Sequence, residues 1–137
     1  YLVEYLRQSS PASPRIDEAG EYLYPQWLIS AKARYTIGDW DMSLRARYTD
    51  SYKDDPAPRT LDALGIPRGT LVNVDSWLVW DANVAYNFTD TNFLSLNVRN
   101  LLDEEPPLVL GTGANVDQIN HSSMGRFITL RYTHRFF

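Results

Sequence analysis

The chain has 137 residues, which suits one domain or part of a larger protein. It contains no cysteine, which excludes a disulfide framework and thiolate metal ligands. No run of about 18 apolar residues predicts a transmembrane helix. The net charge of −4 disfavours nucleic acid as a partner.

Apolar and polar side chains alternate with a period of two through most of the sequence, and this predicts β-strands. Residues 1–8 are expected to form a first strand. Residues 25–37 form a longer second strand that ends at a tight turn near Gly38 and Asp39. Its apolar face carries Trp27, Ile29, Ala31, Ala33, Tyr35 and Ile37, and its polar face carries Ser30, Lys32, Arg34 and Thr36.

Four further strands are predicted at residues 41–53, 75–88, 92–102 and 124–137, with a tight turn near residues 89–92. Their apolar faces carry Met42, Leu44, Ala46, Tyr48, Leu78, Trp80, Ala82, Val84, Tyr86, Phe88, Leu94, Leu96, Val98, Ile128, Leu130, Tyr132 and Phe136. Their polar faces carry Ser43, Arg45, Arg47, Thr49, Asp81, Asn83, Asn87, Ser95, Asn97, Arg99, Thr129, Arg131, Thr133 and Arg135. Residues 61–66 are the one short stretch of helical character.

Strand length and the order of the connections favour a membrane barrel. Several strands hold about a dozen residues, whereas soluble strands average roughly 5–6 and strands that cross a bilayer need about 9–11. Connections alternate between long (9–24, 54–74, 103–123) and short (38–41, 89–92), so in a meander all long connections lie at one end. The predicted fold is all-β: an antiparallel up-and-down meander of about six long strands, part of a transmembrane β-barrel.

The placement of charge supports the same prediction. Most basic residues lie on the polar faces of the strands, and most acidic residues lie in the connections. In a barrel the polar face lines a wet lumen, whereas an Arg that faces lipid at the bilayer midplane would cost about 2–4 kcal/mol. Aromatic residues near the strand ends suit the interfacial girdles.

The stretch NVRNLLDEEPPLVLG at residues 97–111 runs from a strand into acids and two prolines. We expect the strand to leave the membrane near Leu101 and Leu102, and the prolines to end strand pairing. Together with MGRFITLRYTHRFF at residues 124–137, this stretch resembles the C-terminal end of TonB-dependent outer-membrane receptors. The matching motif positions are Asn100, Leu101, Asp103, Pro106, Pro107, Gly125, Arg126, Phe127 and Phe137, with Leu102 in place of the usual Phe.

The resemblance covers residues 75–137 well and residues 25–53 in general pattern. It implies a 22-stranded barrel of the bacterial outer membrane, of which residues 1–137 would be the C-terminal part, with the plug domain absent. It also implies a transporter and not an enzyme, for energised uptake of a ferric siderophore, cobalamin or an oligosaccharide. The implied partners are outer-membrane lipid, the plug domain and remaining strands, the TonB energy-transducing complex and the barrel assembly machinery.

Two kinds of site follow from the resemblance. Tyr132, Phe136 and Phe137 on the final strand would form the signal that the assembly machinery reads. Loops 54–74 and 103–123 are the candidates for ligand contact, because long exposed loops carry recognition. The Arg and Lys side chains of the lumenal face could contact an anionic ligand or pair with acids of the plug.

Other interpretations of the sequence remain open. A passive porin, an adhesin or a soluble glycan-binding β-sandwich would share the alternation. The acid pairs Asp54–Asp55 and Asp103–Glu105 could bind a metal ion, and Asp117 with His121, Ser122 and Ser123 has the residue types of a hydrolytic triad. Isolated loop carboxylates are usually solvated and no nucleophile elbow accompanies the triad types, so we expect no catalytic residue, no metal site and no cofactor.

Overall fold

The computed structural model describes residues 2–21 and 24–136. These residues form two compact units. The sheet unit comprises the described residues of Ile29–Arg47, Leu78–Glu105 and Met124–Phe137. The loop unit comprises the described residues of Tyr1–Leu28, Tyr48–Trp77 and Pro106–Ser123.

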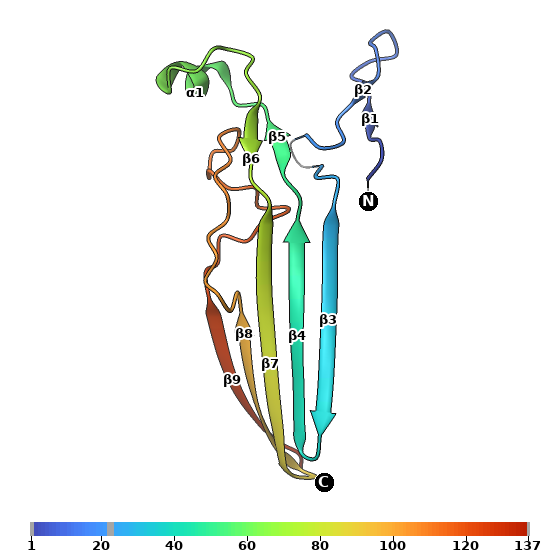
Figure 1. The fold of residues 1–137 in the computed structure, drawn as a ribbon, viewed down its shortest axis with the longest axis vertical. Helices are drawn as coiled ribbons and strands as arrows, with labels where there is room; N and C mark the ends of the chain where they lie inside the picture. Colours follow the sequence, from blue (N-terminus) through green and yellow to red (C-terminus); the bar gives the residue numbers. More distant parts are fainter. Residues whose placement is uncertain (1, 22–23, 137) are drawn as a thin grey trace. The chain divides into compact units, whose positions relative to one another are not determined.

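Five long strands lie side by side in one sheet (Figure 1), in the order β3-β4-β7-β8-β9. Their bounds are β3 (Leu28–Ile37), β4 (Trp40–Thr49), β7 (Trp77–Thr89), β8 (Asn92–Arg99) and β9 (Phe127–His134). Since the long strands are neighbours in chain order, the predicted up-and-down meander is confirmed. The sheet of this chain is not closed: β3 and β9 are its two edges.

The strand register confirms the predicted faces. Across β7, β8 and β9, apolar residues form continuous rows: Ala82, Val98 and Ile128; then Val84, Leu96 and Leu130; then Tyr86, Leu94 and Tyr132. Between them run rows on the opposite face, such as Asn83, Asn97 and Thr129, because successive side chains point to opposite faces.

The two tight turns each have two residues between the strands. Gly38 and Asp39 join β3 to β4, and Gly38 has φ +53°, a left-handed conformation that glycine adopts without strain. Asp90 and Thr91 join β7 to β8, and there the hydroxyl of Thr89 accepts the N–H groups of Thr91 (3.3 Å) and Asn92 (3.1 Å).

The apolar face of the sheet unit is exposed. Leu78, Leu96, Ile128 and Leu130 are between 40% and 67% exposed. Among the described residues, Val79 is the one buried apolar residue of this unit, whereas Tyr52, Leu61, Val74, Trp77, Val109 and Val116 belong to the loop unit. A soluble sandwich would bury this face under a second layer, so the exposure favours a surface that meets hydrocarbon.

The loop unit contains short elements: β1 (Leu6–Arg7), β2 (Ile16–Asp17), β5 (Tyr52–Asp54), α1 (Pro58–Ala63) and β6 (Val72–Val74). β1 pairs with β2, and β5 pairs with β6. Its core is a cluster of Tyr52, Val74 and Val109, each at most 2% exposed. The helix begins with Pro58 at its first turn, where the missing N–H costs nothing, and Gly65 at φ +68° lies beyond its end.

Several expected boundaries differ from the structure. The strands predicted at 25–37 and 124–137 are shorter, at Leu28–Ile37 and Phe127–His134, and the helical stretch predicted at 61–66 lies at Pro58–Ala63. In residues 1–8, the described part forms only the two-residue β1 and no sixth long strand. The predicted strand 41–53 divides into β4 and β5 because the Asp50 carboxylate accepts the Ser51 N–H (2.9 Å) and the Tyr48 hydroxyl (3.0 Å), which bends the chain. β8 ends at Arg99 and not near Leu102.

In the described part of the chain, no helix has the length and apolar character to cross a bilayer.

Candidate functional site

The motif around Asn100 forms a turn that closes β8. Asn100 has φ +53° and its side chain is buried. Its amide donates to the Glu104 carbonyl (2.9 Å) and its amide oxygen accepts the Glu104 N–H (2.8 Å). Asn tolerates the left-handed region better than most residues. Asn100 therefore sets the end of β8. This end lies upstream of Pro106 and Pro107, which were expected to end strand pairing.

Asp81 of β7 ties this turn to the neighbouring strands. Its Oδ1 accepts the backbone N–H of Asn100 (3.0 Å) and the Arg47 Nη2 of β4 (3.2 Å), while its Oδ2 accepts Arg47 Nε (3.0 Å). The Leu101 N–H also donates to the Trp80 carbonyl (2.6 Å). The Asp81 carboxylate thus links β7 to β4 and to the end of β8, in addition to the backbone hydrogen bonds between these strands.

The second half of the motif meets the start of the last strand. Asp103, at φ +60°, accepts the Arg126 N–H (2.6 Å), and its other carboxylate oxygen lies 3.5 Å from the Arg126 guanidinium. A Cβ on Gly125 would lie 3.0 Å from Asp103 Oδ1, so glycine gives this contact room. Leu101, Pro106 and Pro107 are half-buried. The structure therefore brings Asp103, Gly125 and Arg126 together, although they are far apart in sequence.

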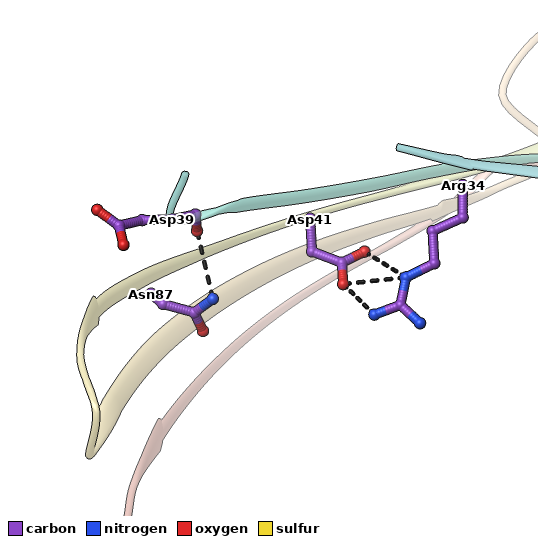
Figure 2. Close-up of polar contacts among 4 residues, drawn as sticks. All are labelled: Arg34, Asp39, Asp41 and Asn87. Atoms are coloured by element: carbon purple, nitrogen blue, oxygen red, sulfur yellow. Dashed lines mark hydrogen bonds and ion pairs between the residues drawn. The ribbon is translucent and has the colours of Figure 1, made fainter. Parts of the chain in front are cut away.

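The polar face of the sheet unit carries charged pairs. In Figure 2, the guanidinium of Arg34 on β3 points at the carboxylate of Asp41 on β4; Arg34 Nε is 3.0 Å from both oxygens. Nearer the turn, the Asn87 amide donates to the Asp39 carbonyl (3.3 Å), joining β7 to the β3–β4 turn (Figure 2). The same face lines a hollow of about 630 Å³.

The two candidate ligand loops pack against each other in the loop unit. The buried Tyr52 hydroxyl donates to Asp117 Oδ2 (2.9 Å), and the Gly111 N–H donates to Asp54 Oδ2 (2.7 Å). Burial raises the pKa of Asp117, but hydrogen bonds from Asn120, the Ile119 N–H and Tyr52 outweigh it and hold the pKa below its ordinary value. The carboxylate is therefore ionised and acts as the acceptor around which residues 117–121 fold.

His121 is buried among rings in the same unit. Trp77 lies edge-on at 5.3 Å between ring centroids and Tyr52 at 6.0 Å. Neither ring nitrogen of His121 has a hydrogen-bond partner. Burial lowers the pKa of His121 below its ordinary value of 6.5, and the Asp117 charge opposes this only in part.

The residue types of a hydrolytic triad do not assemble. The Asp117 side chain accepts bonds from Tyr52 and Asn120, and it does not orient the His121 ring. Among the residues that the structure describes, no three His, Cys, Asp or Glu side chains are grouped so that they could hold a metal ion. Asp117 therefore supports the fold of the loop unit, and no hydrogen bond of its carboxylate reaches the His121 ring.

The final strand ends in a polar and aromatic cluster. Asn92 Oδ1 lies 2.7 Å from the Tyr132 hydroxyl and 2.6 Å from His134 Nδ1. The Phe136 ring stands edge-on to His134, at 4.5 Å between centroids, and is 85% exposed. Phe137, the third residue of the expected assembly signal, lies outside the described residues. The role of the three as a signal stays a prediction.

Two contacts were not anticipated from the sequence. Asp81 was assigned only to a polar face, and the sole hint of its role is that it is an acid within a strand. The pairing of Asp54 with Gly111 joins residues 57 positions apart and leaves no local pattern. Asp54 Oδ1 would be only 2.3 Å from a Cβ at position 111, which explains the glycine there.

Comparison with known families identifies the chain's similarity to a receptor family. The model of the TonB dependent receptor-like β-barrel matches residues 4–101. This range ends after Asn100 and Leu101, so the motif from Asp103 onward and the last strand rest on the resemblance alone. A search of curated proteins and a search of solved structures each found no significant match. The match spans well over half of the chain and agrees with the open, two-faced sheet, and the chain therefore belongs to the family of TonB-dependent receptor β-barrels.

Proposed function

We propose that this chain forms the C-terminal part of the barrel wall of a receptor that takes up a scarce nutrient across the bacterial outer membrane. The observation that carries the proposal is the two-faced sheet in a chain of this family: apolar rows such as Val84, Leu96 and Leu130, with Leu96 and Leu130 exposed, on one face, and charged residues on the other. In this proposal the apolar rows meet lipid and the charged face lines the lumen.

The proposed partners follow from what the sheet leaves unpaired. β3 and β9 are edges with free ladder groups, so further strands of the barrel would pair there. A plug domain would fill the lumen, and the TonB complex would act on that plug to supply energy. The final strand, with Tyr132, Phe136 and Phe137, would be read by the barrel assembly machinery.

The proposed ligand contacts lie in loops 54–74 and 103–123. Both contribute to the loop unit, and the bonds Tyr52–Asp117 and Asp54–Gly111 bind the segments around them together. Pre-organised loops lose less entropy when a ligand binds. The ligand would be a ferric siderophore, cobalamin or an oligosaccharide.

The test is growth of a strain that lacks the gene, with the complete gene restored as the control. Media limited in turn for iron, for cobalamin and for simple sugars would be compared. We expect a defect in one medium, restored by the gene, and loss of the corresponding uptake when a protonophore removes the proton gradient.

Uptake that persists without a proton gradient would instead favour a passive porin. No uptake defect, together with reduced attachment to surfaces, would favour an adhesin. Recovery of the full-length protein without detergent would contradict a membrane barrel altogether.

A further inference from the structure

The core of the loop unit contains a histidine whose ring is packed as a neutral group. His121 is 5% exposed, and neither of its ring nitrogens bonds to a group in the described part of the chain. Its backbone N–H donates to the Asp117 carbonyl (2.9 Å), and its ring lies against the rings of Trp77 and Tyr52. A neutral ring in such a place costs far less free energy than a charged one, so the packing selects the neutral imidazole.

The polar groups around the ring are already engaged or are donors themselves. An imidazolium donates through both nitrogens, and Trp77 Nε1 is a buried donor that cannot accept. Asp117 is the charged group that acts on His121. Its Oδ2 accepts the Tyr52 hydroxyl and the Asn120 amide, and its Oδ1 accepts the backbone N–H groups of Ile119 and Asn120. These four bonds fill the acceptor sites of a carboxylate, so Asp117 has none left for an imidazolium.

This packing belongs to the chain itself. Both ring nitrogens of His121 are shielded from solvent by residues of the loop unit, so a plug or a further strand could reach them only by displacing those residues. Asp54 of β5, the other buried acid of this unit, bonds to the Gly111 N–H (2.7 Å). A second proton on His121 therefore opposes the closed loop unit in a complete receptor as well.

The ring of His121 lies where two connections meet. His121 belongs to connection 103–123, whereas Tyr52 and Trp77 flank connection 54–74. The bond from the Tyr52 hydroxyl to Asp117 Oδ2 (2.9 Å) joins the same two segments. Departure of the ring from this core would therefore loosen the contact between the connections.

We propose that His121 is an acid-sensitive latch: in mild acid its ring takes up a proton and moves into water, and connections 54–74 and 103–123 separate. The inference rests on the proposed function, because these connections are the candidate ligand contacts. The receptor would hold its ligand near neutral pH and release it in acid. Histidine suits this role because its charge changes close to neutral pH.

The pH range of the latch follows from the two states of His121. Burial lowers its pKa in the closed unit, whereas the ring returns toward the ordinary value of 6.5 once it is in water. Protons therefore favour the open form as the pH falls from about 6.5 toward the closed-state pKa. Since one group takes up one proton, the ratio of open to closed rises by at most about tenfold per pH unit. Asp117 acts elsewhere, because its lowered pKa puts its titration below 3.8.

The experiment measures the distance between the two connections in the complete receptor purified in detergent. Spin labels are attached at Leu64→Cys and Ala114→Cys, two exposed positions on different connections. Residues 1–137 contain no cysteine, and any other cysteine of the receptor is replaced by serine. We expect one narrow distance distribution at about pH 7.5 and an added longer component at about pH 5, lost again on return to neutral pH. In H121F, whose ring takes up no proton, the longer component should be absent at both pH values.

The matched control is H134Q, which removes the other histidine of residues 1–137. His134 lies on β9 in the sheet unit, with Nδ1 2.6 Å from Asn92 Oδ1, so this variant should open in acid as the parent does. Heat-modifiable mobility in gels shows that each variant folds. If H121F is already open at neutral pH, modification of the parent by diethyl pyrocarbonate, which attacks neutral imidazole, decides the question. His121 should be protected at about pH 7.5 and more reactive at about pH 6, relative to urea-unfolded receptor at the same pH.

Four results would overturn the inference. They are an unchanged distance distribution in the parent, acid opening of H121F equal to that of the parent, loss of the opening in H134Q, and His121 reactivity that does not rise in acid. None of these measurements uses the nutrient. Each of the four results leaves proton-gradient-dependent uptake at neutral pH intact, so it can be told apart from failure of the proposed function.

Discussion

At Asn100, one side chain both turns the backbone and satisfies the groups that the turn exposes. The left-handed φ removes the chain from the ladder, and the amide binds both backbone groups of Glu104. Gly111 is the opposite case, since its function depends on having no side chain beside Asp54. Both residues lie in connections that pack closely against neighbouring groups. These close contacts explain why Asn occurs at one position and Gly at the other.

Replacement of Asn100 by Ala should destabilise the folded receptor. The variant N100A loses two partly buried hydrogen bonds and leaves an alanine at φ +53°, where no side-chain bond offsets the strain, for an expected cost of about 1–3 kcal/mol. N100G keeps the backbone conformation without strain and should lose less. Urea unfolding in detergent measures both, and an N100A receptor as stable as the parent would contradict the turn described above.

Gly111→Ala should loosen the loop unit. The added Cβ would be 2.3 Å from Asp54 Oδ1, a distance that forces the carboxylate away from the Gly111 N–H. Gly113→Ala is the matched control, because no atom lies within 4 Å of its added Cβ. Protease cleavage of loops on intact cells should increase for G111A and stay unchanged for G113A; equal cleavage of the two would disprove the contact.

The loop unit should lose stability in mild acid through His121. Burial lowers its pKa below 6.5, so between that value and the lower folded-state pKa the unfolded chain binds more protons than the folded one. Stability is therefore complete above about pH 6.5 and falls as the pH drops from there toward the folded-state pKa. The lowered pKa of Asp117 acts in a separate window, below its ordinary value of 3.8.

Hydrogen exchange in residues 48–77 and 106–123, compared at about pH 7.5 and about pH 5 after correction for intrinsic rates, measures this loss. H121Q should remove the pH dependence, although it will also lower stability at neutral pH. If H121Q kept the full pH dependence, another group would be responsible.

Among the elements, the long strands carry apolar residues on one face and polar residues on the other. Leu96 sits in an apolar row between Val84 and Leu130, while its chain neighbour Asn97 sits in a polar row between Asn83 and Thr129. Two adjacent residues of one strand therefore lie on opposite faces of different chemistry, and the same substitution at each should have different effects.

Leu96→Arg should reduce assembly in the outer membrane, whereas Asn97→Arg should be tolerated. A guanidinium that faces lipid costs about 2–4 kcal/mol near the midplane, and a lumenal one costs little. The measurement is the amount of heat-modifiable receptor in purified outer membranes. Equal amounts for the two variants would mean that the faces are wrongly assigned.

Sequence periodicity was enough to predict the long strands and their faces, because a period of two is imposed on every residue of a half-wetted sheet. It did not predict the end of β8 at Asn100 or the break at Asp50, because each depends on a single side chain that bonds to nearby backbone. The contacts Asp54–Gly111 and Tyr52–Asp117 were also out of reach, since they join distant loops and leave no repeat in the sequence.

For the whole chain, the decisive feature is that the sheet has two edges. β3 and β9 each leave a row of backbone donors and acceptors without partners in this sheet. Every residue of β3 is exposed. In hydrocarbon such groups must be paired, so a wall of five long strands requires further strands to close it.

Residues 1–137 expressed alone should therefore not transport. Reconstituted in liposomes, this chain should give no specific uptake of the nutrient identified in the growth tests and no heat-modifiable form, because the edges stay open. The complete receptor in matched liposomes is the positive control for folding. Specific uptake by residues 1–137 would show that the chain closes on its own or as an oligomer.

The shared core of the loop unit has a practical consequence for anyone who raises antibodies against this receptor. Tyr52 and Val74 come from one connection and Val109 from another, and the bonds Tyr52–Asp117 and Asp54–Gly111 cross between the same two segments. A synthetic peptide of either segment alone would lack the other half of that core and would not hold its native shape. Immunogens should therefore present both segments together on a scaffold, and sera raised in that way should recognise living cells better than sera raised against single peptides.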